Sequence, residues 1–144
     1  MNENQELTST VFSFSPKGES MWPFLKHKKQ SVVIDSSITP KNYDVILFVR
    51  NNGEKVLHRV IEILPDAFIC SGDSVLKTEK VGKDAVIGVM TGYYKKDVFI
   101  CVRNEKYQNR VISYYKNPRK RQRKIKRFSF RLKLKNKLKK VLGK

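Results

Sequence analysis

Residues 44–63 read DVILFVRNNGEKVLHRVIEI, and this stretch decides the expected fold. Its first part, 44–50, is a nearly continuous apolar run, as in a fully buried strand. The tripeptide Asn-Asn-Gly at 51–53 follows, and these residue types tolerate the positive φ angles of a tight hairpin turn. Residues 55–63 then supply the returning strand. The sequence therefore predicts an antiparallel β-hairpin in the middle of the chain.

Short β-like runs continue on both sides of this hairpin, separated by turn residues. Long segments with helical periodicity are missing from residues 1–115, and residues 110–115 are expected to close the sheet. The sequence therefore predicts one mainly β, antiparallel domain over residues 1–115. Further strands are expected at 31–35, 67–70, 85–94 and 97–103.

The charge of the chain divides it at residues 117–118, Asn-Pro. The whole chain has a formal net charge of +18, but residues 1–115 carry 16 Lys and Arg against 13 Asp and Glu. Residues 116–144 carry 15 Lys and Arg and no acidic residue. The basicity therefore belongs to a C-terminal tail and not to the β domain.

Apolar residues in the tail follow two competing patterns. From 128 to 134 they alternate strictly, which is strand periodicity, and from 134 to 142 they recur at the spacing of one helix face. The sequence alone does not decide between them. We expect a basic amphipathic segment that becomes ordered on a partner.

Three interpretations of residues 119–144 follow from this composition. Cations interleaved with apolar side chains suit the surface of an anionic membrane. The same cations would bind the phosphates of nucleic acid, but no base-reading motif accompanies them, so nucleic acid is the less favoured partner. The third interpretation is a solvated, disordered tail.

The protein is expected to be cytoplasmic. Peripheral attachment to a membrane surface is a further option. No apolar run approaches the roughly 20 residues of a membrane-spanning helix. Residues 1–6 are polar and acidic, without the basic and apolar regions of a secretory signal.

Residues 18–23 read GESMWP, and this segment suggests chemistry rather than packing. Its serine, Ser20, is followed 38 residues later by His58, and the pair Gly72-Asp73 comes 14 residues after the histidine. A serine, a histidine and a carboxylate are the attacking group, the proton acceptor and the orienting acid of an activated nucleophile. The three signals together therefore predict the parts of an activated nucleophile.

These motifs, in this order and spacing, resemble the type I signal peptidases and the LexA-like serine peptidases over residues 14–92. In that superfamily the serine of a Ser-Met pair is the nucleophile, which implies this role for Ser20. The resemblance also places Met21 and Pro23 at the substrate-binding region. Gly18 has no side chain to bind the oxyanion, so the oxyanion hole would depend on backbone N–H groups such as that of Ser20.

The base is implied by residues 58–61, HRVI, which match a family motif that begins with the catalytic base. Histidine at this place is similar to the endoplasmic-reticulum and archaeal branch, whereas most bacterial enzymes use lysine. Histidine is neutral near pH 7 without the large pKa shift that lysine requires. On a strand, His58 would share the apolar face of Val56 and Val60.

The acid has two candidates. Asp73 matches the aspartate of the family's Gly-Asp-Asn element and is the preferred residue, and Glu79, six positions later, is the alternate. His27, the other histidine, fits no family position and is expected at the surface.

The resemblance implies a serine endopeptidase that cleaves an exported or leader-bearing peptide or preprotein, without a metal or cofactor. Two alternatives stay open. A LexA-like self-cleaving regulator would need a DNA-binding domain, and the 19 residues ahead of Ser20 are too few for one. A non-catalytic β domain could bind peptides or nucleic acid. The oligomeric state is open.

Overall fold

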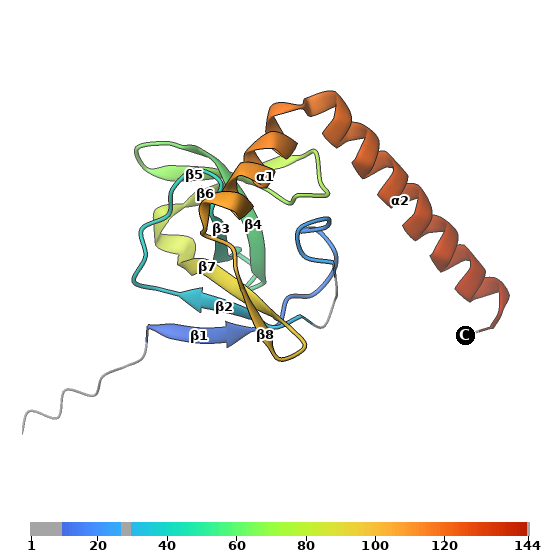
Figure 1. The fold of residues 1–144 in the computed structure, drawn as a ribbon, viewed down its shortest axis with the longest axis horizontal. Coiled ribbons are helices and arrows are strands. Elements are labelled where there is room, and N and C mark those ends of the chain that lie inside the picture. Colours follow the sequence, from blue (N-terminus) through green and yellow to red (C-terminus); the bar gives the residue numbers. More distant parts are fainter. Residues whose placement is uncertain (1–9, 27–29, 144) are drawn as a thin grey trace, which may run out of the picture.

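The computed structural model describes residues 10–26 and 30–143, and it shows a mainly β protein with two C-terminal helices (Figure 1). The expected fold class is therefore confirmed. The strands are β1 (Val11–Phe14), β2 (Val32–Asp35), β3 (Val45–Val49), β4 (Lys55–Ile63), β5 (Ala67–Ser71), β6 (Thr78–Gly82), β7 (Val86–Lys95) and β8 (Val98–Cys101). The helices are a short 3₁₀ helix, η1 (Lys83–Ala85), and the α-helices α1 (Glu105–Lys116) and α2 (Pro118–Val141).

All eight strands belong to one antiparallel sheet. Their spatial order is β1-β2-β7-β3-β4-β5-β6, and β8 pairs with β7. The predicted hairpin is confirmed as β3 and β4, which pair from Val45 opposite Arg59 to Val49 opposite Lys55. Gly53 in its turn has a φ of +85°, a conformation that glycine adopts without steric cost. This hairpin lies in the interior of the sheet, because β3 also pairs with β7 and β4 with β5.

The sheet buries side chains on both faces, as the apolar run of the hairpin predicts. Successive residues of a strand point to opposite faces. On β4, Leu57 belongs to a core cluster that also contains residues of α1, whereas Val56 and Val60 belong to a second cluster with Phe48 of β3. The expected apolar face around His58 is therefore confirmed.

The expectation that residues 110–115 form a closing strand is wrong, because they lie in α1. Asn104 caps this helix, since its side chain accepts a hydrogen bond from the backbone N–H of Tyr107 at 2.8 Å. Tyr107 and Val111, four residues apart, are both buried in the core. This spacing, together with the preceding asparagine, is the helix signal that a strand interpretation overlooks.

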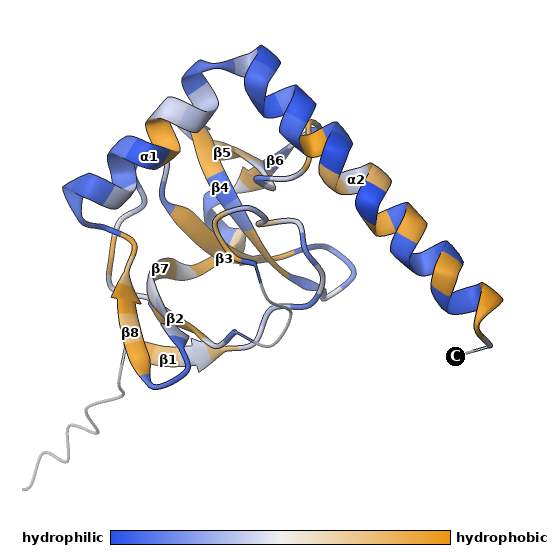
Figure 2. Cartoon of the chain, turned by 45° about the vertical axis from the view of Figure 1, so that its right-hand side comes forward, coloured by the Kyte–Doolittle hydropathy of each residue, from blue (hydrophilic) through white to orange (hydrophobic). Residues whose placement is uncertain are grey.

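The basic tail forms the single helix α2, which begins where the composition of the chain changes. Residues two apart on a helix are separated by about 200°. The alternation from 128 to 134 therefore distributes apolar side chains over two opposite helix faces. Figure 2 shows apolar and hydrophilic residues alternating along α2. On the inner face, Ile125 is buried and the Phe128 ring stacks on Trp22, with ring centroids 4.4 Å apart. The first half of the tail is therefore packed on the β domain.

Candidate active site

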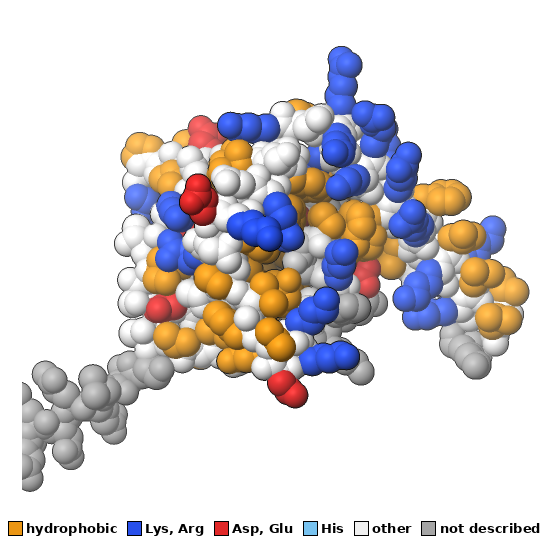
Figure 3. Space-filling view, viewed as in Figure 1, with side chains coloured by type: hydrophobic (Ala, Val, Ile, Leu, Met, Phe, Trp, Pro, Cys, Tyr) orange, Lys and Arg blue, Asp and Glu red, His pale blue; other side chains and the backbone are white. Residues whose placement is uncertain are grey.

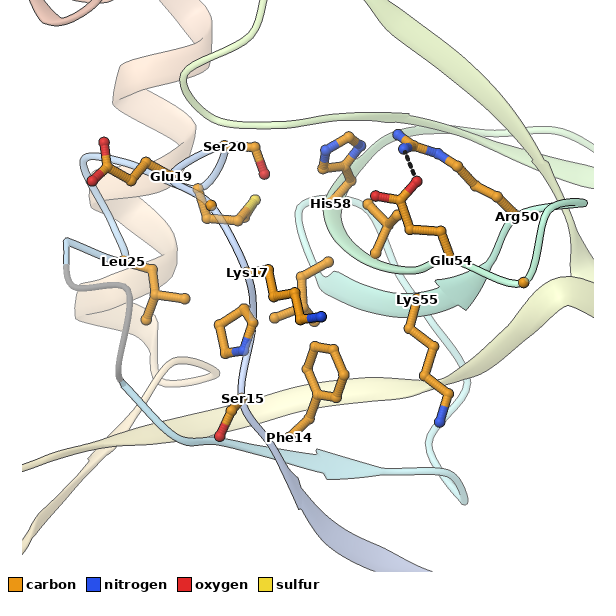
Figure 4. A pocket seen from close by; sticks show the side chains of 16 residues that line it. Phe14, Ser15, Lys17, Glu19, Ser20, Leu25, Arg50, Glu54, Lys55 and His58 are labelled. Atoms are coloured by element: carbon orange, nitrogen blue, oxygen red, sulfur yellow. Dashed lines mark hydrogen bonds and ion pairs between the residues drawn. The ribbon is translucent and has the colours of Figure 1, made fainter. Parts of the chain in front are cut away.

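Ser20 and His58 line the same cleft, which has a volume of about 550 Å³. One wall comes from residues 14–21, which run from the end of β1 into the β1–β2 connection, and the other comes from β4 and the β3–β4 turn. Figure 4 shows the Ser20 side chain next to the His58 imidazole at one end of the cleft. The fold therefore brings together two residues that are 38 positions apart in the sequence.

Ser20 is held by the turn that follows β5. The backbone N–H of Ser74 donates to the carbonyl oxygen of Ser20 at 2.9 Å, and the Ser74 hydroxyl donates to the carbonyl of Glu19 at 2.9 Å. A Cβ atom on Gly72 would lie 2.7 Å from the Ser20 carbonyl oxygen, which is too close for any side chain. Gly72 is therefore required where the backbone of the serine segment packs against this turn.

His58 is 7% exposed and projects from β4 toward the cleft. Its Nδ1 lies 2.9 Å from Oε1 of Glu79 on β6, although the contact is not aligned as a linear hydrogen bond. Arg50 binds the same carboxylate, with Nη2 at 2.8 Å from Oε1 and Nε at 3.3 Å from Oε2. With Nδ1 directed at Glu79, Nε2 is the ring nitrogen available to Ser20.

Asp73, the preferred acid in the sequence, lies elsewhere. Its carboxylate accepts two hydrogen bonds from the Arg59 guanidinium at 2.8 Å each and a further one from the Tyr115 hydroxyl. Asp73 and Arg59 are both fully buried. His58 and Arg59 are successive residues of β4 and face opposite sides of it, so an acid that binds Arg59 is on the wrong side for His58. The acid beside the histidine is the alternate, Glu79.

The electrostatics of the cleft suit a general base. Burial lowers the pKa of His58 below its ordinary value of 6.5, and the nearby Glu79 offsets part of that decrease. A hydrogen bond from Arg50 lowers the pKa of Glu79. At neutral pH the imidazole is therefore neutral and can accept a proton, while Glu79 is ionised and can stabilise the imidazolium that results.

If the cleft cleaves peptides with His58 as the base, the pH dependence of cleavage is expected to follow the titration of His58. Because a base accepts a proton only in its neutral form, kcat/KM should then rise with pH and level off, with a midpoint below 6.5. Glu79 raises the pKa of His58, so Glu79→Gln should move this midpoint to lower pH and also lower the plateau. A pH–rate profile of both proteins, with the His58 ring titrated by NMR, checks this. A midpoint above 6.5, or a shift to higher pH in Glu79→Gln, would contradict it.

The remaining expected site residues separate into two groups. Gly18 and Met21 line the cleft, with Gly18 at a φ of +81° and Met21 mostly buried in the core. Pro23 does not line this cleft and instead contributes to a second cavity beside α1 and α2. Pro23 therefore lies away from the Ser20 cleft, whereas Met21 lines it. His27 lies outside the described residues.

Several cleft residues were not anticipated from the sequence. Lys17, Glu54 and Lys55 line the walls, and Arg50 positions the acid. Arg50 stands at the end of a predicted strand, but nothing in the sequence indicates a partner 29 residues away. Among residues 10–26 and 30–143, no group of three or more His, Cys, Asp or Glu side chains is arranged to hold a metal ion.

Comparison of the chain with protein-family models, with curated proteins and with solved structures gave no match. The fold therefore places Ser20 and His58 on two walls of one cleft in a mainly β protein, with a carboxylate oxygen of Glu79 2.9 Å from Nδ1 of the histidine.

Proposed function

We propose that the protein is a serine endopeptidase of the signal-peptidase type, in which Ser20 is the nucleophile, His58 the base and Glu79 the orienting acid. The observation that carries the proposal is the cleft that holds Ser20 beside a buried histidine whose far nitrogen contacts a carboxylate. A serine hydroxyl is activated when a base lies next to it and an orienting group lies next to the base. The resemblance of the motifs to the histidine-base peptidases supports the same assignment.

The chemistry is acyl transfer. His58 Nε2 takes the proton of Ser20 as Oγ bonds to the peptide carbonyl carbon, and it then gives that proton to the leaving amine as the C–N bond breaks. Water, deprotonated by His58, then bonds to the acyl carbon, and His58 returns this proton to Ser20 Oγ as the bond between Oγ and the acyl carbon breaks. Backbone N–H groups, including that of Ser20, would stabilise the oxyanion.

The hydrogen bonding between the Ser20 and His58 side chains bears on the proposed mechanism. Within the described part of the chain, Ser20 and His58 are not joined by a hydrogen bond. Catalytic hydrogen bonds are often long or poorly aligned before substrate binds and shorten in the reacting complex. Adjacent side chains without a formed bond are therefore compatible with the proposed mechanism.

The sheet edge that leads into the cleft supports a peptide as the substrate. β1 is the terminal strand of the sheet, and its last residue, Phe14, lines the cleft. A terminal strand has one row of backbone groups that can pair with an extended peptide. We propose that a peptide or preprotein with a leader segment binds in this way, and that its scissile bond reaches Ser20.

The test is cleavage of an unbiased pool of synthetic peptides, followed by intact-mass measurement. Wild type should yield defined products and Ser20→Ala should yield none. Ser15→Ala is the matched control, because Ser15 lines the same cleft but lies away from His58 (Figure 4), and it should retain the products of wild type. Identical product spectra from wild type and Ser20→Ala would reject the proposal.

A further inference from the structure

The second half of α2 extends beyond the β domain. Every residue from 133 to 143 is exposed, whereas Ile125 and Phe128 on the preceding turns contact the domain. Figure 1 shows this helix projecting away from the sheet. Its outer end is therefore a surface element that no described residue of the β domain covers.

A row of large apolar side chains follows the outer end of α2, and we name it the outer stripe. Its members are spaced four, four and three residues apart, so they lie on one face of the helix. That face is opposite the one that carries Ile125 and Phe128. Each side chain is between 49% and 75% exposed, and Figure 3 shows them gathered near the end of the helix. The outer stripe consists of Phe130, Leu134, Leu138 and Val141.

Cations surround the outer stripe. α2 contains no acidic residue along its 24 residues, and Lys and Arg occupy most positions between the apolar ones. Figure 3 shows their side chains along the helix, beside the apolar cluster. Long basic side chains can lay their apolar stems along a hydrophobic surface while the charged ends reach a polar layer. The basic residues that lie nearest to the outer stripe on the helix are Arg127, Arg131, Lys133 and Lys137.

The occupant of this face must accept both its apolar and its cationic groups. A second copy of α2 would bring two strongly basic faces together without counter-charge. The phosphates of nucleic acid would neutralise the cations but would leave the apolar side chains in water. The surface of a bilayer with anionic headgroups satisfies both, because apolar side chains enter the acyl boundary while cations stay at the headgroups.

We propose that the outer stripe and the surrounding Lys and Arg side chains bind the surface of a membrane that contains anionic phospholipids, with α2 lying in the plane of the interface. No helix in the described ranges, 10–26 and 30–143, is long and apolar enough to cross a membrane. The Trp22–Phe128 stack and buried Ile125 fix α2 to the β domain, so binding through α2 attaches the whole domain. This surface acts independently of the proposed peptidase activity.

The experiment is flotation of the full-length protein with lipid vesicles. Wild type should bind vesicles of phosphatidylcholine and phosphatidylglycerol, bind pure phosphatidylcholine weakly, and dissociate as salt is raised. The triple variant Phe130→Ala, Leu134→Ala, Leu138→Ala should lose more than about tenfold in affinity for the anionic vesicles. Alanine preserves helix propensity, so circular dichroism should show helix content unchanged.

The matched control is Gln122→Ala with Asn136→Ala, two exposed polar positions on α2 outside the stripe, and it should bind as wild type does. Undiminished vesicle binding by the triple variant would overturn the proposal. Equal binding to neutral and anionic vesicles would overturn it as well. Tighter binding to a single-stranded oligonucleotide than to anionic vesicles, unaffected by the triple substitution, would instead assign α2 to nucleic-acid phosphates.

Discussion

The variant His58→Gln is expected to cleave its peptide substrate about 10⁴-fold more slowly than wild type at neutral pH. Glutamine retains a polar side chain beside Glu79 but cannot take up the Ser20 proton. Without that proton transfer the hydroxyl is a weak nucleophile. Ser20→Ala should cause a loss of similar size, because it removes the attacking oxygen itself.

The double variant Ser20→Ala, His58→Gln should be no slower than either single variant. Two groups that act as one unit are not additive, since removing either abolishes the step that both perform. Initial rates on the peptide identified from the pool, measured for all four proteins, test this. Thermal unfolding serves as the control that each variant is folded. Additive losses in the double variant would show that the two residues act separately and would contradict the proposed unit.

The β3–β4 hairpin and the face of β4 on which His58 lies could be predicted from the sequence, because both depend on residues that are close together in the chain. The apolar run of β3, the Asn-Asn-Gly turn and the alternation along β4 are local patterns with period two. The position of His58 among Val56 and Val60 follows from the same alternation. Its adjacency to Ser20 does not follow from periodicity, and only the resemblance of the motifs indicated it.

The identity of the acid could not be predicted, because it depends on pairing between distant strands. Glu79 reaches His58 through the alignment of β4 with β5 and of β5 with β6, in which Val60 lies opposite Cys70 and Cys70 opposite Glu79. The family motif favoured Asp73 on position alone. An arginine in the middle of an apolar strand was nevertheless a usable signal, since a buried guanidinium requires a buried acid.

The structure of the tail could not be predicted from its sequence for a different reason. Its alternating apolar residues fit a strand locally, but a strand needs a neighbour to satisfy its backbone, whereas a helix satisfies its own. One face of α2 packs on the β domain, and the opposite face carries the outer stripe. The apolar residues alternate in the sequence because they belong to these two faces in turn. Short windows of sequence do not distinguish that arrangement from a strand.

Replacing the buried carboxylate in Asp73→Asn is expected to lower the free energy of unfolding by about 3–5 kcal/mol. Asparagine has nearly the same shape, so no cavity forms, but Arg59 would remain buried without a counter-charge. The Arg59 guanidinium also donates to the carbonyl oxygen of Tyr43 at 2.8 Å, which holds it in place and prevents its escape to water. A domain of this size has only about 5–15 kcal/mol of stability, so this variant should be close to unfolding.

The matched control is Glu79→Gln, the same carboxylate-to-amide change in an ion pair that is partly exposed. Its loss of stability should be below about 1 kcal/mol, because solvent screens the Arg50–Glu79 pair. Urea unfolding of both variants measures the difference. Arg59→Met combined with Asp73→Leu removes both charges and should recover part of the loss. If Asp73→Asn were as stable as Glu79→Gln, the Arg59–Asp73 pair would not support the fold, which would contradict this prediction.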